Sequence, residues 1–269
     1  MYLICMKGYY NMDLTSPRTI RNIQEQFGFT FKKGLGQNFL TARNILEEIV
    51  DAAEIESGVI EVGPGFGVLT SELAQNSDKV VTIEIDERLI DVLDYTLAEY
   101  DNVKIINEDI LKLDLKKVID DEFNGEKVSI AANLPYYITT PIITKLLEEK
   151  LPIKNIVVMV QKEVAERMSA KPSTKDYGAI TVLCQYYTEP SIVANVPASL
   201  FVPPPKVDSA VLKLKVLDKP SVEVKDEGVF FRVVKAAFSQ RRKTLLNCLS
   251  ANFPIPKDEI STLLESIGI

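Results

Sequence analysis

The sequence predicts an α/β protein with a Rossmann-like, doubly wound sheet and a small C-terminal all-α domain. From residue 59 onward, short apolar segments rich in valine and isoleucine alternate with helical segments, which is typical of a parallel sheet covered by helices. A glycine-rich turn follows the first of these strands, and beyond residue 217 only helical segments are found.

The predicted elements follow one another without a repeat. Residues 1–28 form an N-terminal extension with one helix over 16–27, where Ser16-Pro17 resembles a cap followed by a proline at the first helical position. Residues 29–218 form the sheet domain, and residues 219–269 form a small helical domain. We expect strands over 59–62, 80–85, 103–106, 128–132, 156–160, 191–196 and 209–216, the last two closing the sheet antiparallel. We expect helices over 41–53, 68–75, 87–100, 140–149, 228–251 and 257–267.

The composition excludes several classes of protein. The chain has no histidine, which excludes Ser-His-Asp hydrolysis and histidine-ligated metal sites. The three cysteines (Cys5, Cys184 and Cys248) are odd in number and widely spaced, so neither a disulfide framework nor a zinc site is expected. No apolar run approaches the roughly 20 residues that span a bilayer. We therefore expect a cytoplasmic monomer with no metal and no membrane contact.

Charge is distributed unevenly along the chain. The net charge is −7, and residues 44–150 contain 9 basic and 24 acidic residues. The segments on either side, 1–43 and 151–269, each have four more basic than acidic residues. Basic flanks of this kind can hold a polyanion such as nucleic acid. Ordinary variation of a solvated surface is the alternative explanation.

The turn Gly63-Pro64-Gly65-Phe66-Gly67 lies between a predicted strand and a predicted helix, where nucleotide-binding loops occur. Dinucleotide sites use free backbone amides to bind pyrophosphate, but Pro64 has no amide hydrogen. The third glycine also arrives one residue earlier than in G-x-G-x-x-G. S-adenosylmethionine, which has no phosphate, suits this turn better than NAD does. A tight turn without a ligand is the alternative.

Polar residues follow the next two predicted strands, and the carboxyl ends of parallel strands meet at one edge. Glu84 could accept hydrogen bonds from both ribose hydroxyls of a cofactor, with Asp86 as the competing candidate. Asp109 could accept the adenine amine while Ile110 packs on the ring. Asp109 could instead cap a helix.

The tetrapeptide Asn133-Leu134-Pro135-Tyr136 follows the fourth predicted strand. The Asn133 side-chain oxygen and the Leu134 carbonyl, turned outward by Pro135, could each accept one hydrogen of an adenine N6 amine. Tyr136 could stack on the base, a contact worth about 1–3 kcal/mol. The lone pair of N6 would then point toward a methyl donor, so that alignment rather than a strong base provides the rate. A proline turn that caps a strand is the alternative.

Further candidates lie outside these strand ends. Phe201, before a triple proline, could provide a second stacking face, although it could equally be a core residue at a strand entry. Arg241, Arg242 and Lys243 are expected on a helix of the tail, where they suit a phosphate backbone or form a solvated face. Lys32 and Lys33 are similar, and Asn38 nearby is a further candidate cofactor contact.

The chain resembles the ribosomal small-subunit RNA adenine dimethylases, the KsgA/RsmA family, from about Ser16 to Gly268. The matching segments are Leu35–Leu40, Glu61–Gly65, Asn133–Tyr136, Gln161–Val164, Phe201–Ala210 and Phe238–Thr244. The resemblance implies a class I methyltransferase sheet that binds S-adenosylmethionine. It implies cofactor contacts at Asn38, Leu40, Gly63, Glu84, Asp109 and Asn133; Leu40 comes from the resemblance alone, and Gly65 belongs to the same turn.

The implied reaction is the dimethylation of N6 on two adjacent adenosines in the 3′-terminal hairpin loop of 16S rRNA, within a 30S subunit or its precursor. Members of the family commonly continue beyond the equivalent of Gly268, so the helical domain is expected to be truncated here. A 23S rRNA methylase of the macrolide-resistance type is the nearest rival, but such enzymes usually carry isoleucine where Leu134 stands. A non-catalytic ribosome-assembly or transcription factor and an NAD-dependent dehydrogenase are two further hypotheses.

Overall fold

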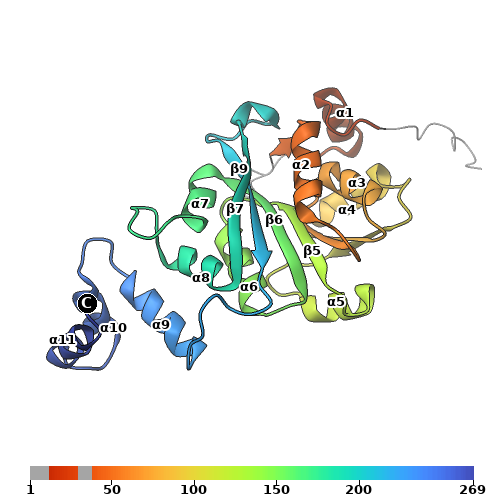
Figure 1. Ribbon diagram of the computed structural model, residues 1–269. Coiled ribbons are helices and arrows are strands. Elements are labelled where there is room, and N and C mark those ends of the chain that lie inside the picture. Colours follow the sequence, from red (N-terminus) through yellow and green to blue (C-terminus); the bar gives the residue numbers. More distant parts are fainter. Residues whose placement is uncertain (1–11, 30–37) are drawn as a thin grey trace, which may run out of the picture.

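The computed structural model describes residues 12–29 and 38–269, and its centre is a seven-stranded sheet (Figure 1). The strand order is β4-β3-β2-β5-β6-β9-β7. The first five strands in this order, from β4 through β3, β2 and β5 to β6, are parallel to one another. Strand β9 runs antiparallel to both of its neighbours. The strands span Val59–Val62 (β2), Val80–Glu84 (β3), Val103–Asn107 (β4), Val128–Asn133 (β5), Ile153–Gln161 (β6), Thr188–Val196 (β7) and Ser209–Val216 (β9).

Strand order reverses between β2 and β5. From β2 the chain builds outward through β3 to β4, and then returns to place β5 on the opposite side of β2. The loops that leave β2 and β5 therefore diverge at the carboxyl edge of the sheet and leave a crevice there. Open α/β sheets bind their ligands at this topological switch point.

Helices cover both faces of the sheet, because consecutive strand residues point to opposite sides. Val59 belongs to the hydrophobic core on one face and Ile60 to the core on the other. The first face is covered by α1 (Pro17–Phe27), α2 (Arg43–Ala53), α3 (Val68–Gln75) and α4 (Ile90–Thr96). The second is covered by α5 (Leu115–Phe123), α6 (Thr139–Glu148), α7 (Lys162–Met168) and α8 (Ala179–Tyr187).

A second, two-stranded sheet lies beside the site edge. Strand β1 (Phe39–Leu40) pairs antiparallel with β8 (Phe201–Val202), and Leu40 stands opposite Phe201. The Thr41 amide extends this contact by donating to the Leu200 carbonyl at 2.9 Å. This pairing brings the segment that contains Asn38 to the carboxyl edge of the main sheet.

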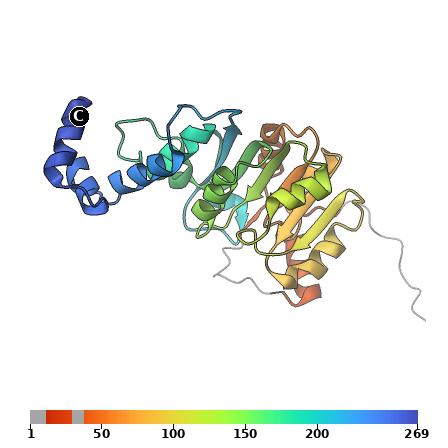
Figure 2. The ribbon, with the colours of Figure 1, turned by 90° about the horizontal axis from the view of Figure 1, so that it is seen from below.

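Three tail helices, α9 (Glu227–Ala237), α10 (Leu245–Asn252) and α11 (Lys257–Ser266), extend from one side of the sheet body (Figure 2). The joint is aromatic: the ring of Tyr186 lies 5.1 Å from that of Phe230, and the ring of Tyr187 lies 5.8 Å from that of Phe231. Glu227 accepts hydrogen bonds from both tyrosine hydroxyls. The start of the tail is therefore packed firmly against α8.

The predicted strands and the antiparallel closure are confirmed, with ends that shift by up to three residues. The single helix predicted over 228–251 is wrong: the chain forms two helices separated by residues 238–244. Thr244 begins the second of these, since its hydroxyl accepts from the Asn247 amide, and such caps start helices. Helix α5 was not predicted, although Asp114 caps it by accepting from the Lys117 amide at 3.0 Å. Helices α7 and α8 and the short strands β1 and β8 were also missed.

No helix among residues 12–29 and 38–269 combines the length and the hydropathy that a membrane span requires.

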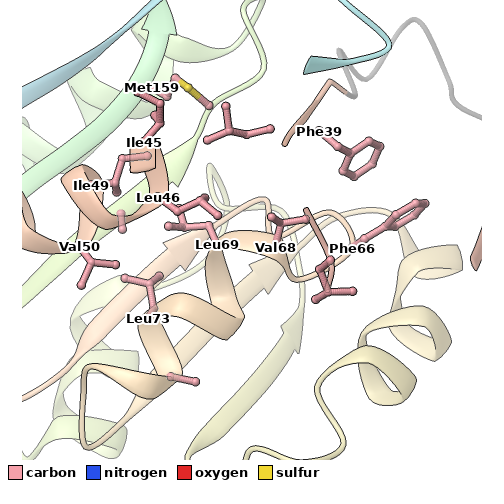
Figure 3. Packing of buried hydrophobic residues seen from close by; sticks show 14 of the residues in the cluster. Phe39, Ile45, Leu46, Ile49, Val50, Phe66, Val68, Leu69, Leu73 and Met159 are labelled. Carbon is pink, nitrogen blue, oxygen red and sulfur yellow. The ribbon is translucent and has the colours of Figure 1, made fainter. Parts of the chain in front are cut away.

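We predict that Phe66→Ala destabilises the fold and also weakens ligand binding at the sheet edge. Phe66 is fully buried, and its ring stacks on that of Phe39 at 4.4 Å (Figure 3). Loss of a buried phenylalanine costs about 3–5 kcal/mol, which chemical denaturation would measure. Val222→Ala, at a position that is 52% exposed, is the control and should change stability by less than about 0.5 kcal/mol. Equal stability of the two variants would contradict this view of the core.

Candidate active site

A pocket lies at the carboxyl edge of the sheet, between the loops that follow β2 and β5. The residues that line it come from every predicted strand end on this edge. They are Asn38, Phe39, Leu40, Glu61, Gly63, Pro64, Gly65, Glu84, Ile85, Glu108, Asp109, Ile110, Asn133, Pro135, Tyr137 and Ile138, with apolar side chains such as Leu46, Ile49 and Met159 at its base. The sheet topology has thus brought together residues that are up to 121 positions apart, from Asn38 to Met159.

The glycine turn forms one wall of the pocket and requires glycine for two reasons. Gly63 and Gly65 have φ angles of 71° and 60°, in the left-handed region that other residues rarely adopt. A Cβ atom at position 65 would lie only 2.6 Å from the ring of Phe39. A side chain at position 65 would therefore collide with the wall formed by β1.

Glu84 is the last residue of β3, and its carboxylate lies at the pocket edge. Its Oε1 accepts a hydrogen bond from the Asp86 amide at 2.8 Å. Burial raises the pKa of Glu84 to about 7, against the opposing effect of backbone amides that hydrogen-bond to it. Asp86 is instead engaged by the guanidinium of Arg88, with Nε at 2.8 Å. The structure thus favours Glu84 over Asp86 as the group available to a ligand.

A second buried carboxyl, Glu61, was missed by the sequence analysis. It lies in the middle of β2, is 1% exposed, and accepts a hydrogen bond from the Thr70 hydroxyl at 2.5 Å. Burial raises the pKa of Glu61 to about 8, and the nearby charge of Glu84 acts in the same direction. Its place in the strand before Gly63 was the available signal, since an acidic residue on a fully buried strand is unusual.

Asp109 caps a turn and also lines the pocket. Its Oδ1 accepts from the Leu111 amide at 3.0 Å, so that it caps the turn after β4. The residue also lines the pocket, beside the buried side chain of Ile110. The Lys112 Nζ atom forms an ion pair with the Asp109 carboxylate, 3.8 Å from its Oδ2 atom. A contact between Asp109 and a ligand amine stays a prediction.

The Asn133 side chain is held in one orientation by the segment before β1, on the opposite side of the pocket. Its Nδ2 donates to the Asn38 carbonyl at 2.9 Å, across 95 positions of sequence. Because the amide nitrogen is used in this way, the oxygen Oδ1 is the atom that remains to accept a hydrogen bond from a ligand. The Leu134 amide donates to the Met159 carbonyl at 3.1 Å and its side chain is buried, which anchors the turn.

The aromatic residues near the turn differ in how firmly they are fixed. Tyr136 is half-buried, and its hydroxyl bonds the hydroxyl of Ser209, at the start of β9, at 2.9 Å. Tyr137 lines the pocket and is 59% exposed; it was not among the predicted site residues. Phe201 is only 2% exposed and belongs to the hydrophobic core. This agrees with the alternative given from the sequence, a core residue at a strand entry. Its stacking on a base stays a prediction.

The predicted basic residues lie elsewhere. Arg241, Arg242 and Lys243 are exposed, but they lie in the segment between α9 and α10 and not on a helix as expected. Thr244, which caps α10, ends this segment. Lys32 and Lys33 lie outside the described residues. Within the described ranges, no cluster of acidic residues and cysteines has the arrangement that a metal ion would need.

The charge of the pocket identifies the class of ligand that it can hold. Four carboxyl side chains (Glu61, Glu84, Glu108 and Asp109) and no lysine or arginine are among the described residues that line it. Such a pocket repels a phosphate or pyrophosphate group and attracts a cation. The Glu84 carboxylate can accept hydrogen bonds from the hydroxyls of a ribose. The apolar side chains of Ile85 and Ile110 suit a planar base. The residues therefore fit a nucleoside with a positively charged substituent.

Comparison with known proteins gives consistent matches. Residues 28–265 match the family model described as ribosomal RNA adenine dimethylase. Proteins named Ribosomal RNA small subunit methyltransferase A from Bacillus mycoides and Bacillus cereus are 54% identical over 263 residues, which cover 96% of this chain and 90% of each relative. A dimethyladenosine transferase from Plasmodium falciparum has a TM-score of 0.66 at 31% identity, covering 85% of this chain and 89% of its own. The 23S rRNA methyltransferase ErmE has a TM-score of 0.64 at 29% identity, covering 86% and 90%.

We predict that the free energy of unfolding falls as pH rises from about 5 to 8. The folded-state pKa of Glu61, about 8, lies above the ordinary value of 4.5. The native state therefore binds more protons than the unfolded state in this range, and stability is lost as pH rises through the folded pKa. The slope from one such group is at most about 1.4 kcal/mol per pH unit.

Urea unfolding of wild type and Glu61→Gln at pH 5.5 and 8 would measure this effect. The glutamine cannot ionise, so its stability should change less between the two pH values. Glu47→Gln, on the exposed face of α2, should follow wild type. If the stability of Glu61→Gln changed with pH as much as that of wild type, the ionisation of Glu61 would not be the cause of the pH dependence.

Proposed function

The chain belongs to the ribosomal RNA adenine dimethylase family, and from this we propose that it transfers methyl groups from S-adenosylmethionine to N6 of two adjacent adenosines in the 3′-terminal hairpin loop of 16S rRNA. Each adenosine receives two methyl groups. The substrate is 16S rRNA in a 30S subunit or its precursor, in the cytoplasm, and the protein acts as a monomer. The observation that carries the proposal is the Asn133 amide, which lines an acidic pocket and whose nitrogen is fixed by the Asn38 carbonyl, so that its oxygen remains to accept a hydrogen bond.

The pocket supports S-adenosylmethionine over a dinucleotide. When bound, this cofactor supplies a methyl group on a positively charged sulfur. The carboxylates of Glu84, Glu108 and Asp109 can stabilise positive charge, whereas Glu61, whose pKa is raised to about 8 by burial, is mostly uncharged at neutral pH; Glu84 can accept hydrogen bonds from both ribose hydroxyls. Ile85 and Ile110 would contact the adenine ring, and Asn38 and Leu40 line the pocket on the side of β1. An NAD-dependent dehydrogenase is disfavoured because a pyrophosphate would face these carboxyl groups.

Asn133, Leu134 and Tyr136 would position the target base. The Asn133 Oδ1 atom and the Leu134 carbonyl each accept one N6 hydrogen, so the amine is held with its lone pair directed into the pocket. Tyr136 presents its ring to the base, and its hydroxyl bond to Ser209 restricts the ring's rotation. Burial raises the pKa of Tyr136, which keeps this hydroxyl protonated and uncharged. Rate then comes from alignment of the amine within a pre-formed site.

The choice of 16S over 23S rRNA rests on the relatives rather than on the fold. The Plasmodium falciparum dimethyladenosine transferase and ErmE resemble this chain almost equally in structure. The relatives with 54% identity are named as small-subunit methyltransferases. Leu134, where 23S enzymes usually carry isoleucine, agrees with the small subunit.

The proposal is tested by methyl transfer to undermethylated 30S subunits, with the modified nucleotides mapped by mass spectrometry. Wild type should give two adjacent N6,N6-dimethyladenosines in 16S rRNA. Asn133→Ala should abolish transfer and keep cofactor affinity within about tenfold, or roughly 1.4 kcal/mol. Asn195→Ala, at an exposed position of β7, is the control and should behave as wild type. Modification confined to 23S rRNA, or none with wild type, would overturn the proposal.

We predict the opposite pattern for Glu84→Ala. This change removes the ribose acceptor, so cofactor binding should weaken by at least tenfold in calorimetry, while affinity for 30S subunits stays unchanged. Wild-type affinity should also increase as pH rises through about 7, because Glu84 ionises there and the charged form accepts hydrogen bonds more strongly. Unchanged cofactor affinity in the variant would remove Glu84 from the site.

A further inference from the structure

The Glu61 carboxyl group lies beneath the glycine turn, between two hydroxyl groups. Glu61 lines the pocket but is only 1% exposed, and its Oε2 atom accepts a hydrogen bond from the Thr70 hydroxyl of α3. Thr82 stands opposite Glu61 on the neighbouring strand β3, so the two side chains project to the same face of the sheet. The buried Thr82 hydroxyl makes no regular hydrogen bond among residues 12–29 and 38–269, and it favours the charged form of Glu61.

No lysine or arginine faces this carboxyl group among the described residues that line the pocket. The core around it on α2, α3 and β5 is uncharged, namely Leu46, Ile49 and Leu69, drawn in Figure 3, and Ala131, which pairs with Glu61. Glu84, at the end of β3, is the titratable group that acts on Glu61, and its charge has the same sign. Glu108 and Asp109 add two more carboxyl groups to the pocket. A buried carboxyl group in these surroundings keeps its proton until a positive charge approaches.

The proposed reaction changes the charge of the molecule that occupies the pocket. As a methyl group passes to N6, the bond between sulfur and the methyl carbon breaks and a bond between N6 and that carbon forms. The electron pair of the broken bond stays on sulfur, which becomes neutral, and N6 releases one proton. The occupant therefore has one positive charge fewer after the transfer, as S-adenosylhomocysteine, than before it. A buried acidic group responds strongly to such a change, because charges interact strongly at low dielectric.

We propose that Glu61 distinguishes the cationic cofactor from its neutral product, because it is ionised beside the first and protonated beside the second. This inference rests on the proposed function and extends it to the release of product. With the cofactor bound, the Glu61 carboxylate accepts from Thr70, and the Thr82 hydroxyl is available as a second donor. Once the sulfur is neutral, Glu61 takes up a proton from solvent and the attraction between opposite charges is lost. The product therefore binds less tightly than the cofactor.

The consequence is a difference in the number of protons that the two ligands displace. Burial raises the pKa of Glu61 to about 8, so most of the ligand-free protein carries this proton at pH 7. A positive charge lowers the pKa of a carboxyl group, so the cofactor should displace up to one proton from Glu61 and the product none. Glu84 meets the same ribose in both ligands, so its ionisation contributes similarly to both. The preference for cofactor over product should therefore increase between about pH 6 and 8, by up to about tenfold per pH unit.

Isothermal titration calorimetry of the full chain in phosphate and in Tris buffer measures the displaced protons, since the two buffers differ in ionisation enthalpy. At pH 7, wild type should release about 0.5–1 proton more with S-adenosylmethionine than with S-adenosylhomocysteine. Glu61→Gln imitates the protonated group, so this difference should nearly disappear. Its affinity for the cofactor should decrease about tenfold, while its affinity for the product stays within about twofold of wild type. Glu47→Gln, on the exposed face of α2, is the control and should match wild type.

Thr82→Val tests the same role with the Glu61 carboxyl group retained. Loss of the hydroxyl disfavours the charged form, so the increase in the ratio of the two affinities should move to higher pH by about 0.5 units. A merely structural effect would weaken both ligands equally at every pH. If Glu61→Gln did not fold, an unchanged pH profile in Thr82→Val would by itself contradict the proposal.

The two proposals can fail separately. If wild type methylated 16S rRNA and Glu61→Gln kept the full proton difference between the ligands, the role of Glu61 would be wrong and the proposed function would stand. If wild type bound neither ligand and did not methylate 16S rRNA, the proposed function itself would fail.

Discussion

The hydrogen bond from the Asn133 side chain to the Asn38 carbonyl is the interaction on which the proposed chemistry depends. It joins the end of β5 to the segment before β1, and it determines which atom of the amide faces the pocket. β1 in turn is held by its pairing with β8 and by the stacking of Phe39 on Phe66. The orientation of one amide oxygen therefore rests on two sheets and on the hydrophobic core beneath the glycine turn.

Charged side chains are distributed differently in the pocket and in the tail. The pocket is lined by four carboxyl groups and no lysine or arginine among the described residues, so it suits a cationic nucleoside even though burial raises the pKa values of Glu61 and Glu84. Exposed lysines and arginines lie in the segment between α9 and α10 and in the loop before α8. The acidic overall charge of −7 therefore does not conflict with the proposed RNA substrate.

The sequence predicted the sheet and most of the pocket because both follow from local patterns. Buried strands followed by polar residues placed Gly63, Glu84, Asp109 and Asn133 at one edge, and all four line the pocket. Contacts between distant segments had no such pattern: the bond between Asn133 and Asn38, the Tyr136–Ser209 pair and the burial of Phe201 depend on tertiary packing. The break between α9 and α10 was missed because the cap at Thr244 lies within an otherwise helical pattern.

A structure of the protein with a cofactor analogue and an RNA that contains the target adenosine would test the proposed role of Asn133 most directly. We expect N6 to lie within hydrogen-bond distance, about 2.7–3.2 Å, of both the Asn133 Oδ1 atom and the Leu134 carbonyl. The bond from Asn133 to the Asn38 carbonyl should be retained in that complex. An amide turned to present its nitrogen to the base, or an N6 held by other groups, would contradict this role.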